Sequence, residues 1–361
     1  MDALPISQRD ELLHIDVRLD ESAPRSGITE LFRTLRPRWD TDDIQVKVFT
    51  EGITNQLLGC YVGSAGEADV VLVRMYGQMT ELFVDRKREM EMFRLLHAHG
   101  CGPRLYCSFQ NGICYEFVKG TVLDDPLLTQ PAVYRLIAAE MGKLHSIKPQ
   151  SSSSPQTVLW PKLTNYMQLL HTSAGKEASP WQRPCTRLEV PSMDVLLKEM
   201  EDLKRHLTAV DCPVVLCHND LLTKNIIYNS AEGVVKFIDY EYADFNYQAY
   251  DIGNHFNEYA GVNNVDYSLY PSQELQWDWL TEYLQSLRSC SGVDAAVTER
   301  EVQQLYIKVC KFSLASHFCW GVWALLQATY STIDFDFSRY AAARFSYYFK
   351  KKEEYFGMKL P

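Results

Sequence analysis

Residues 214–239 read VVLCHNDLLTKNIIYNSAEGVVKFID, and this stretch decides the fold. Its apolar runs at 214–217 and 234–238 predict two short strands, because runs of this length bounded by turn residues are typical of buried strands. The glycine-containing segment 230–233 predicts a turn between them. Each predicted strand leads to a carboxylate, Asp220 after the first and Asp239 after the second. We therefore expect these two carboxylates to lie at neighbouring strand ends.

The residues around these carboxylates fit one reaction. Asp220 closes the tripeptide His218-Asn219-Asp220, and Asn225 follows it five residues later. Transfer of a phosphoryl group to a hydroxyl needs a carboxylate that orients the attacking oxygen and accepts its proton, and a nearby amide can hold a metal ion. Asp220 suits the first role and Asn225 the second, while Asp239 suits a Mg²⁺ ligand that bridges nucleotide phosphates. The ordered set of strand, His-x-Asp-x₄-Asn, hairpin and strand-Asp predicts a phosphotransferase site.

Two segments resemble the signature of the choline/ethanolamine kinases. They read VLCHNDLLTKNIIYN at 215–229 and VKFIDYEYADFNYQAYDIGNHFNEYAG at 235–261, and the resemblance extends from about residue 31 to 349. It implies an α+β, two-lobed protein-kinase-like fold, the choline kinase and aminoglycoside phosphotransferase type. In that fold a small β-rich N-terminal lobe precedes a larger helical C-terminal lobe, and ATP binds between them.

The resemblance also implies roles for individual residues. Asp220 is expected to be the catalytic base, and Asn225 and Asp239 are expected to hold Mg²⁺. Asp251 is expected to anchor the catalytic loop without taking part in the reaction, whereas the role of Glu241 stays open.

The order of predicted elements agrees with such a fold. We expect strands at 44–49, 56–62 and 69–76, a helix at 81–99, a hairpin over 105–118, and then mainly helices, including 131–146 and 301–330. This places a nucleotide-binding lobe at 1–119 and a helical catalytic and acceptor-binding lobe at 120–361. The start of the chain is polar: its first 40 residues are expected to be part disordered and part helical, with the disorder in the first 30 or so.

Candidate nucleotide contacts fall in two places of the N-terminal lobe. The segment 50–55 reads TEGITN and stands where the family has its phosphate-covering loop. Its backbone N–H groups and the Thr54 hydroxyl can cradle phosphate oxygens, which makes Gly52, Thr54 and Asn55 candidates. By resemblance alone, backbone groups at Glu116 and Val118 are expected to bind adenine. No Gly-x₄-Gly-Lys motif is present, which argues against a P-loop kinase.

Arg74 is the candidate phosphate clamp. It lies on the strand expected at 69–76, where protein kinases have a lysine that pairs with a helix glutamate, and arginine can form such a pair with two parallel hydrogen bonds. Glu89 on the next helix is the expected partner, with Glu91 as the alternative.

Aromatic residues near the C-terminus predict the acceptor pocket. Trp320 and Trp323 are three residues apart in a predicted helix and therefore share a face. Aromatic residues at this spacing more often belong to a core, but choline kinases line their acceptor pocket with two tryptophans, whose ring faces attract an ammonium group. The further candidates for this pocket are two tyrosines, a phenylalanine and a carboxylate: Tyr242, Tyr340, Phe335 and Glu258.

The segment after Glu258 bears on the choice of acceptor. It reads YAGVNNVDYSLYP at 259–271, which resembles the ethanolamine kinases more than the choline kinases, whose stretch is more aromatic. The resemblance implies ATP-dependent phosphorylation of ethanolamine to phosphoethanolamine, the first step of the CDP-ethanolamine route to phosphatidylethanolamine. Ethanolamine keeps three N–H donors, and Asn263, Asn264 and Asp266 are expected either to accept them or to narrow the cavity. Choline kinase and, less closely, an aminoglycoside-type phosphotransferase stay open as alternatives.

The composition excludes several other classes. A net charge of −10 over 361 residues leaves no basic surplus for nucleic acid. Ten cysteines without a Cys-x-x-Cys pair fit the reduced thiols of a cytoplasmic protein. The uncharged run 312–333 is long enough to cross a membrane, but its polar residues favour a buried helix.

Two classes of related fold are disfavoured by single positions. Asp-Tyr-Glu stands at 239–241 where a protein kinase has Asp-Phe-Gly, and a non-catalytic module would be expected to lose Asp220 or Asp239. A small amino alcohol is the expected partner, and a homodimer stays open.

Overall fold

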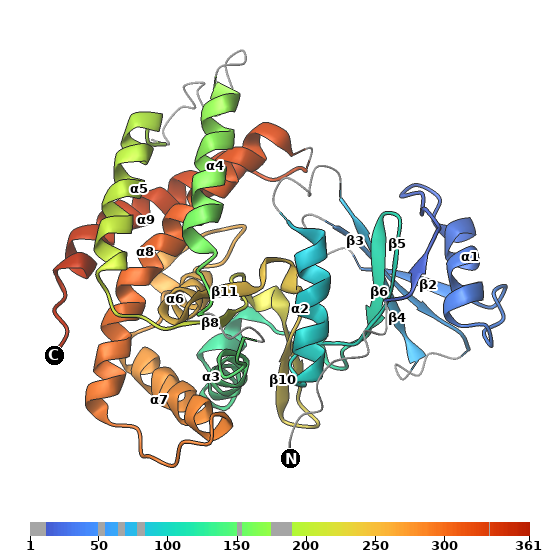
Figure 1. Ribbon diagram of the computed structural model, residues 1–361, viewed down its shortest axis with the longest axis horizontal. Helices are drawn as coiled ribbons and strands as arrows, with labels where there is room; N and C mark the ends of the chain where they lie inside the picture. The colour runs from blue at the N-terminus through green and yellow to red at the C-terminus, as the bar shows by residue number, and fades with distance from the viewer. Residues whose placement is uncertain are drawn as a thin grey trace. The chain divides into compact units, whose positions relative to one another are not determined.

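The computed structural model of the chain describes residues 12–49, 55–63, 69–77, 84–149, 154–174, 190–331 and 333–361. The chain divides into two compact units, Met1–Lys119 and Gly120–Pro361 (Figure 1). That the first unit binds the nucleotide and the second the acceptor stays a prediction.

The first unit is built on a six-stranded sheet in the order β1-β5-β6-β4-β3-β2. β1 is parallel to β5, and all other neighbours are antiparallel. The strands are β1 (His14–Ile15), β2 (Gln45–Phe49), β3 (Asn55–Tyr61), β4 (Val71–Tyr76), β5 (Leu105–Phe109) and β6 (Gly112–Glu116), and the helices are α1 (Arg25–Leu35) and α2 (Arg86–Ala98).

Strand β4 is buried on both faces because successive side chains of a strand point to opposite sides. Val71, Val73 and Met75 belong to the core that includes residues of α1, whereas Leu72 packs in a second cluster with Phe93 of α2. Figure 1 shows α1 and α2 on opposite sides of this sheet. Residue 74 is two positions after Leu72 and so lies on the same face of β4, the face that packs against α2.

The start of the chain is more ordered than expected. Residues 1–11 lie outside the described part, but Ile15, Val17 and Leu19 are 6%, 6% and 2% exposed and pack in the core with α1. The helical part of the prediction corresponds to α1, whereas packing of residues 15–19 in the core was not predicted. Their alternation of apolar and polar residues is a strand-like pattern that overall polarity concealed.

The first helix after β4 begins later than expected. α2 begins at Arg86, and the side chain of Asp85 caps it by accepting the N–H groups of Lys87 and Arg88, each at 3.1 Å. An aspartate that accepts hydrogen bonds from free N–H groups marks a helix start. The expected start at 81 falls in 78–83, outside the described residues.

The second unit is mainly helical. Its helices are α3 (Pro131–His145), α4 (Leu159–Ala174), α5 (Met193–Thr208), α6 (Gln248–Glu258), α7 (Gln273–Cys290), α8 (Glu299–Tyr330) and α9 (Phe337–Gly357), with short 3₁₀ turns η3 (Asp125–Thr129), η5 (Thr223–Asn225), η6 (Tyr240–Tyr242) and η7 (Tyr267–Leu269). α8 packs against α6 and α9, and α3 packs against α7.

Its strands form two small sheets. β10 (Val234–Phe237), β9 (Ile226–Asn229) and β7 (Thr121–Val122) make one, and β11 (Asp244–Tyr247) and β8 (Val214–Cys217) make the other. The sequence predicted β8 and β10 but missed β9 and β11. The turn at 230–233 therefore joins β9 to β10, and β8 pairs with β11.

Helix α8 is long and apolar enough to cross a membrane, the one such helix among the described residues. Its most apolar 18-residue window is 94% buried by other parts of the chain, as in a core helix. This environment favours the buried helix that the sequence predicted over a membrane span.

Candidate active site

One buried carboxylate, Asp251 of α6, anchors the loop that carries Asp220. Its Oδ1 accepts the N–H of Asn219 at 2.7 Å, and its Oδ2 accepts the N–H of His218 at 2.8 Å and Nε2 of His145 at 3.0 Å. Burial alone would raise the pKa of Asp251, but the hydrogen bond and charge of His145 hold it below its ordinary value. Asn219 has a φ of 66°, in the left-handed region. The two backbone hydrogen bonds hold it there, which is the anchoring role expected of Asp251.

Further hydrogen bonds join this loop to the segment around Asp239. His218 Nε2 donates to the carbonyl of Ile238 at 2.9 Å, and Asn219 Nδ2 donates to the carbonyl of Tyr242 at 3.0 Å. Asp239 itself, two residues after the end of β10, has a φ of 62°. Buried side chains thus fix two residues in the left-handed backbone region, one in each segment. The loop that carries Asp220 and the Asp239 turn therefore form one structure.

Asn225 is placed to offer an oxygen atom. Its side-chain nitrogen donates to the carbonyl of Asp220 at 2.8 Å, and its own carbonyl accepts the N–H of Ile238 at 2.9 Å. Because the nitrogen is engaged, Oδ1 is the side-chain atom that remains for a cation. The backbone bond to Ile238 also places Asn225 beside the residue that precedes Asp239.

The electrostatics of this cluster favour a cation. Burial raises the pKa of Asp220 well above its ordinary value, and the charges of Glu258, Asp239 and Glu241 raise it further. Carboxylates that repel one another in a low-dielectric site are stabilised as anions when a divalent cation lies among them. Carboxylate and amide oxygens are the ligands that Mg²⁺ prefers, so the residues present fit that metal.

Next to this cluster, aromatic side chains from η6, α8 and α9 pack edge to face. The ring centroids of Tyr242 and Trp320 are 5.4 Å apart, and those of Trp320 and Trp323 are 5.2 Å apart. Phe337 continues the contact from Trp323 at 5.8 Å. The structure therefore brings together the predicted pocket aromatics in what we call the aromatic cluster: Tyr242, Trp320, Trp323, Phe335, Phe337 and Tyr340.

Two residues that belong to or support the aromatic cluster, Phe337 and Asn254, were not predicted from the sequence. Phe337 begins α9 three residues before Tyr340, so the helical spacing of the two could have revealed it. Asn254 of α6 accepts the indole N–H of Trp320 at 2.8 Å and the Ser316 hydroxyl at 2.8 Å. No local pattern marks that contact, because Asn254 and Trp320 are 66 residues apart in the chain.

Close approach of two helices makes the Asn254 contacts possible. A Cβ atom at Gly253 would lie 2.9 Å from the backbone nitrogen of Ser313, closer than real Cβ contacts allow. Glycine therefore lets α6 lie directly against α8. The neighbouring Asn257 then reaches across as well and donates to the carbonyl of Ser313 at 3.0 Å.

Glu258 has a partner that the sequence did not suggest. Its Oε1 accepts Nη1 of Arg344 at 2.9 Å, and both side chains are almost fully buried. Arg344 also donates to the Ser316 hydroxyl at 2.9 Å. A paired carboxylate contributes less negative potential than an isolated one, so Glu258 supports the helices behind the aromatic cluster. Whether it contacts the acceptor stays a prediction.

The acceptors expected after Glu258 do not belong to the pocket. Asn263, Asn264 and Asp266 are exposed. Asp266 caps η7 by accepting the N–H of Ser268 at 2.9 Å. This expectation was wrong because asparagine and aspartate also serve as turn and cap residues.

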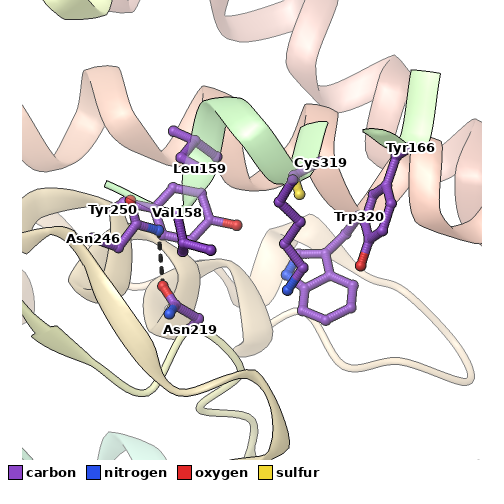
Figure 2. Close-up of a pocket in the computed structure, with 9 residues that line it drawn as sticks. Val158, Leu159, Tyr166, Asn219, Asn246, Tyr250, Cys319 and Trp320 are labelled. Carbon is purple, nitrogen blue, oxygen red and sulfur yellow. Dashed lines mark hydrogen bonds between the residues drawn. The ribbon is translucent and has the colours of Figure 1, made fainter. Parts of the chain in front are cut away.

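A narrow pocket opens between α4 and the site (Figure 2). Figure 2 shows Trp320 and Cys319 of α8 on one side of it and Asn219, from the loop that carries Asp220, on another. Asn219 accepts a hydrogen bond from Asn246 at 2.8 Å, which fixes its side chain at the pocket wall. The remaining lining residues are Val158, Leu159, Lys162, Tyr166 and Tyr250.

In the first unit, Arg74 of β4 is paired with Glu89 of α2, and both side chains are buried. Arg86 also donates to Glu89, at 2.9 Å. Glu91, the alternative partner, faces Arg88 at 3.2 Å instead. The pairing therefore follows the prediction for Glu89, while the contact of Arg74 with phosphate stays a prediction.

The other nucleotide candidates are less defined. Gly52 and Thr54 lie outside the described residues, and Asn55 begins β3. Glu116 ends β6, where its N–H donates to the carbonyl of Arg104 at 2.9 Å, and Val118 follows the strand. Their role in binding adenine stays a prediction.

Comparison with known proteins gives a consistent result. The family model described as choline/ethanolamine kinase matches residues 46–349. Ethanolamine kinase 1 of Mus musculus is 52% identical over 342 residues, which cover 95% of this chain and 93% of that protein. The structure of Plasmodium vivax ethanolamine kinase aligns with a TM-score of 0.77 and 28% identity over 91% of this chain and 89% of that one.

A choline kinase structure from Cryptosporidium parvum aligns with a TM-score of 0.74 and 25% identity, over 91% of this chain and 95% of that one. These structural matches confirm the predicted α+β fold of the choline kinase type.

Proposed function

Because this chain belongs to the choline/ethanolamine kinase family, we propose that it transfers the terminal phosphoryl group of ATP to the hydroxyl of ethanolamine. The products are phosphoethanolamine, used in phosphatidylethanolamine synthesis, and ADP. Similarity to relatives that are named ethanolamine kinases supports this acceptor. The expected cytoplasmic location stays a prediction.

One observation carries the proposal. Tyr242 follows Asp239 by three residues, and its ring packs against Trp320. The carboxylates suited to phosphoryl transfer therefore lie beside aromatic faces suited to an ammonium group. An amino alcohol carries a hydroxyl and an ammonium group two carbons apart, so it matches this pairing of chemistries.

The proposed steps use residues of the second unit. Asp220 orients the ethanolamine hydroxyl and accepts its proton as the oxygen bonds to phosphorus and the bond to the ADP oxygen breaks. Asn225 Oδ1 and the Asp239 carboxylate would hold Mg²⁺, whose charge would balance that of the phosphates. Trp320 and Trp323 attract the ammonium group through their ring faces.

The first unit is proposed to bind the nucleotide. Arg74, oriented by Glu89, pairs with phosphate oxygens, which suit the planar guanidinium group. The loop with Gly52, Thr54 and Asn55 covers the phosphates, and the segment of Glu116 and Val118 contacts adenine.

The test is to identify the product and remove the base. With ATP, Mg²⁺ and ethanolamine, the protein should release ADP and form phosphoethanolamine, seen by phosphorus NMR. Asp220→Ala should lower turnover by roughly 10² or more while nucleotide binding is kept, and Asp239→Ala should also lose Mg²⁺-dependent ATP binding. As a matched control, Asp278→Asn alters a partly exposed carboxylate paired with Arg135 and should leave turnover unchanged. Near-normal turnover of Asp220→Ala would refute the assignment.

A further inference from the structure

Lys162 is a cation that the proposed reaction does not use. It lies in the first turn of α4 and lines the same pocket as Trp320, Cys319 and Asn219. Its Nζ atom lies 4.1 Å from the centroid of the Tyr242 ring. A second ring, Tyr166, lies 5.9 Å away. The protein thus places its own ammonium group on a ring of the aromatic cluster.

Carboxylates surround Lys162, but its ammonium group contacts the Tyr242 ring. Burial lowers the pKa of Lys162, while the charges of Asp220, Glu241 and Asp244 oppose that change. Within the part of the chain that the structure describes, the Lys162 ammonium forms neither a hydrogen bond nor an ion pair. The distance of 4.1 Å is well within the range of cation–π contacts, which extends to about 6 Å. The Tyr242 ring is therefore occupied by a cation before any acceptor enters.

This occupancy affects two classes of acceptor differently. A quaternary ammonium group has no N–H donor, so ring faces provide its main attraction. A primary ammonium group has three N–H donors and can bind carboxylate or carbonyl oxygens instead. Repulsion from Lys162 acts on both, since each carries one positive charge. Loss of a ring face therefore disfavours the quaternary group in particular.

We propose that Lys162 is a selectivity residue of the acceptor pocket, which covers the Tyr242 ring and thereby favours primary amino alcohols over quaternary ones. The inference rests on the proposed function, because it assumes an amino alcohol bound beside Trp320. Lys162 lies on α4, outside the residues predicted from the sequence, because a lone lysine on a helix is usually a solvated surface residue.

The test compares ethanolamine and choline as acceptors for the wild type and for Lys162→Met. Methionine keeps an unbranched side chain of similar length and removes the charge. We expect the preference for ethanolamine over choline, as a ratio of kcat/KM values, to fall about ten-fold, equivalent to about 1.4 kcal/mol. The change should come from a lower KM for choline, with the KM for ATP unchanged. Lys162→Arg should keep the wild-type ratio, because arginine also binds ring faces.

Two comparisons separate this effect from general damage. Lys351 lies over the Tyr355 ring at 5.3 Å on α9, far along the helix from Tyr340, so Lys351→Met is a matched control that should leave the ratio unchanged. If Lys162→Met is unstable, Lys162→Gln provides the same test with a polar side chain. An equal loss of kcat with both acceptors would mean that Lys162 acts on the phosphoryl group, and an unchanged ratio would mean that it has no part in selection. Either result overturns the proposal.

The two hypotheses can fail separately. Wild-type protein that phosphorylates no amino alcohol would refute the proposed function. Wild-type protein that phosphorylates ethanolamine, together with a Lys162→Met ratio equal to wild type, would refute only the role of Lys162.

Discussion

Replacing Asp251 by asparagine should lower both the stability of the protein and its kcat. The carboxylate accepts three hydrogen bonds, from the N–H groups of His218 and Asn219 and from His145. Asparagine has nearly the same shape but offers one oxygen in place of two, so at least one buried donor loses its acceptor. Hydrogen bonds to a charged group contribute about 1.5–3 kcal/mol, and an unpaired buried donor costs about 1–3 kcal/mol. We therefore expect the free energy of unfolding to fall by about 3–5 kcal/mol.

For a unit of this size, 1 kcal/mol corresponds to about 2–4 °C in Tm, so Asp251→Asn should lower Tm by roughly 6–20 °C. Calorimetry measures this, and coupled ADP release measures kcat on the same sample below Tm. Turnover should fall because Asn219 is no longer held at its positive φ and Asp220 moves with it. Asp278→Asn breaks a partly exposed pair with Arg135 and keeps one oxygen for the Tyr134 hydroxyl, so it should cost no more than about 1 kcal/mol. If Asp251→Asn kept Tm within 2 °C and kcat at the wild-type level, the anchoring argument would be refuted.

Three further predictions concern the Arg74–Glu89 pair, the aromatic cluster and the pH dependence of stability. Arg74→Ala, Glu89→Ala and the double variant should show non-additive losses in ATP binding, because removing either residue already disrupts the pair. Strictly additive losses would rule out a functional pair. Trp320→Leu or Trp323→Leu should raise the KM for ethanolamine by about 5- to 30-fold, as expected for loss of a cation–π contact of about 1–2 kcal/mol. The KM for ATP should stay nearly unchanged, and equal effects on both KM values would contradict the pocket assignment. Burial lowers the pKa of His255 to about 4, below its ordinary value of 6.5. Between pH 6.5 and 4 the unfolded chain therefore binds a proton that the folded chain does not, so the free energy of unfolding falls as pH falls. In denaturant titrations the wild type should lose up to about 1.4 kcal/mol per pH unit in this window from this group, and His255→Asn should respond less; identical slopes would argue against it.

That the candidate site residues Asp220, Asn225 and Asp239 lie close together could be predicted from their spacing, while their roles in the reaction stay predictions. Asp220, Asn225 and Asp239 lie within one turn-rich segment, so the chain itself keeps them together once the flanking strands form. The pairing of those strands was less predictable. Short apolar runs carry no information on their partners, and β8 pairs with β11, whose residues 244–247 include polar side chains.

Contacts between distant parts of the chain could not be predicted. Arg344 and Glu258 are 86 residues apart, and a buried arginine leaves no mark in the sequence. Lys162 was missed for the same reason, since only the packing of α4 against the site places it over Tyr242. Polar side chains after Glu258 led to the opposite error, because their pattern fits a capped turn as well as a binding site.

The central claim is that this kinase acts on ethanolamine in preference to choline. The most direct measurement is kcat/KM for both alcohols on the wild-type protein, with saturating ATP and Mg²⁺. Acceptor groups left unpaired by three methyl groups cost about 1–3 kcal/mol each, so we predict a ratio of ten-fold or more in favour of ethanolamine. A ratio in favour of choline would contradict the account of the acceptor pocket.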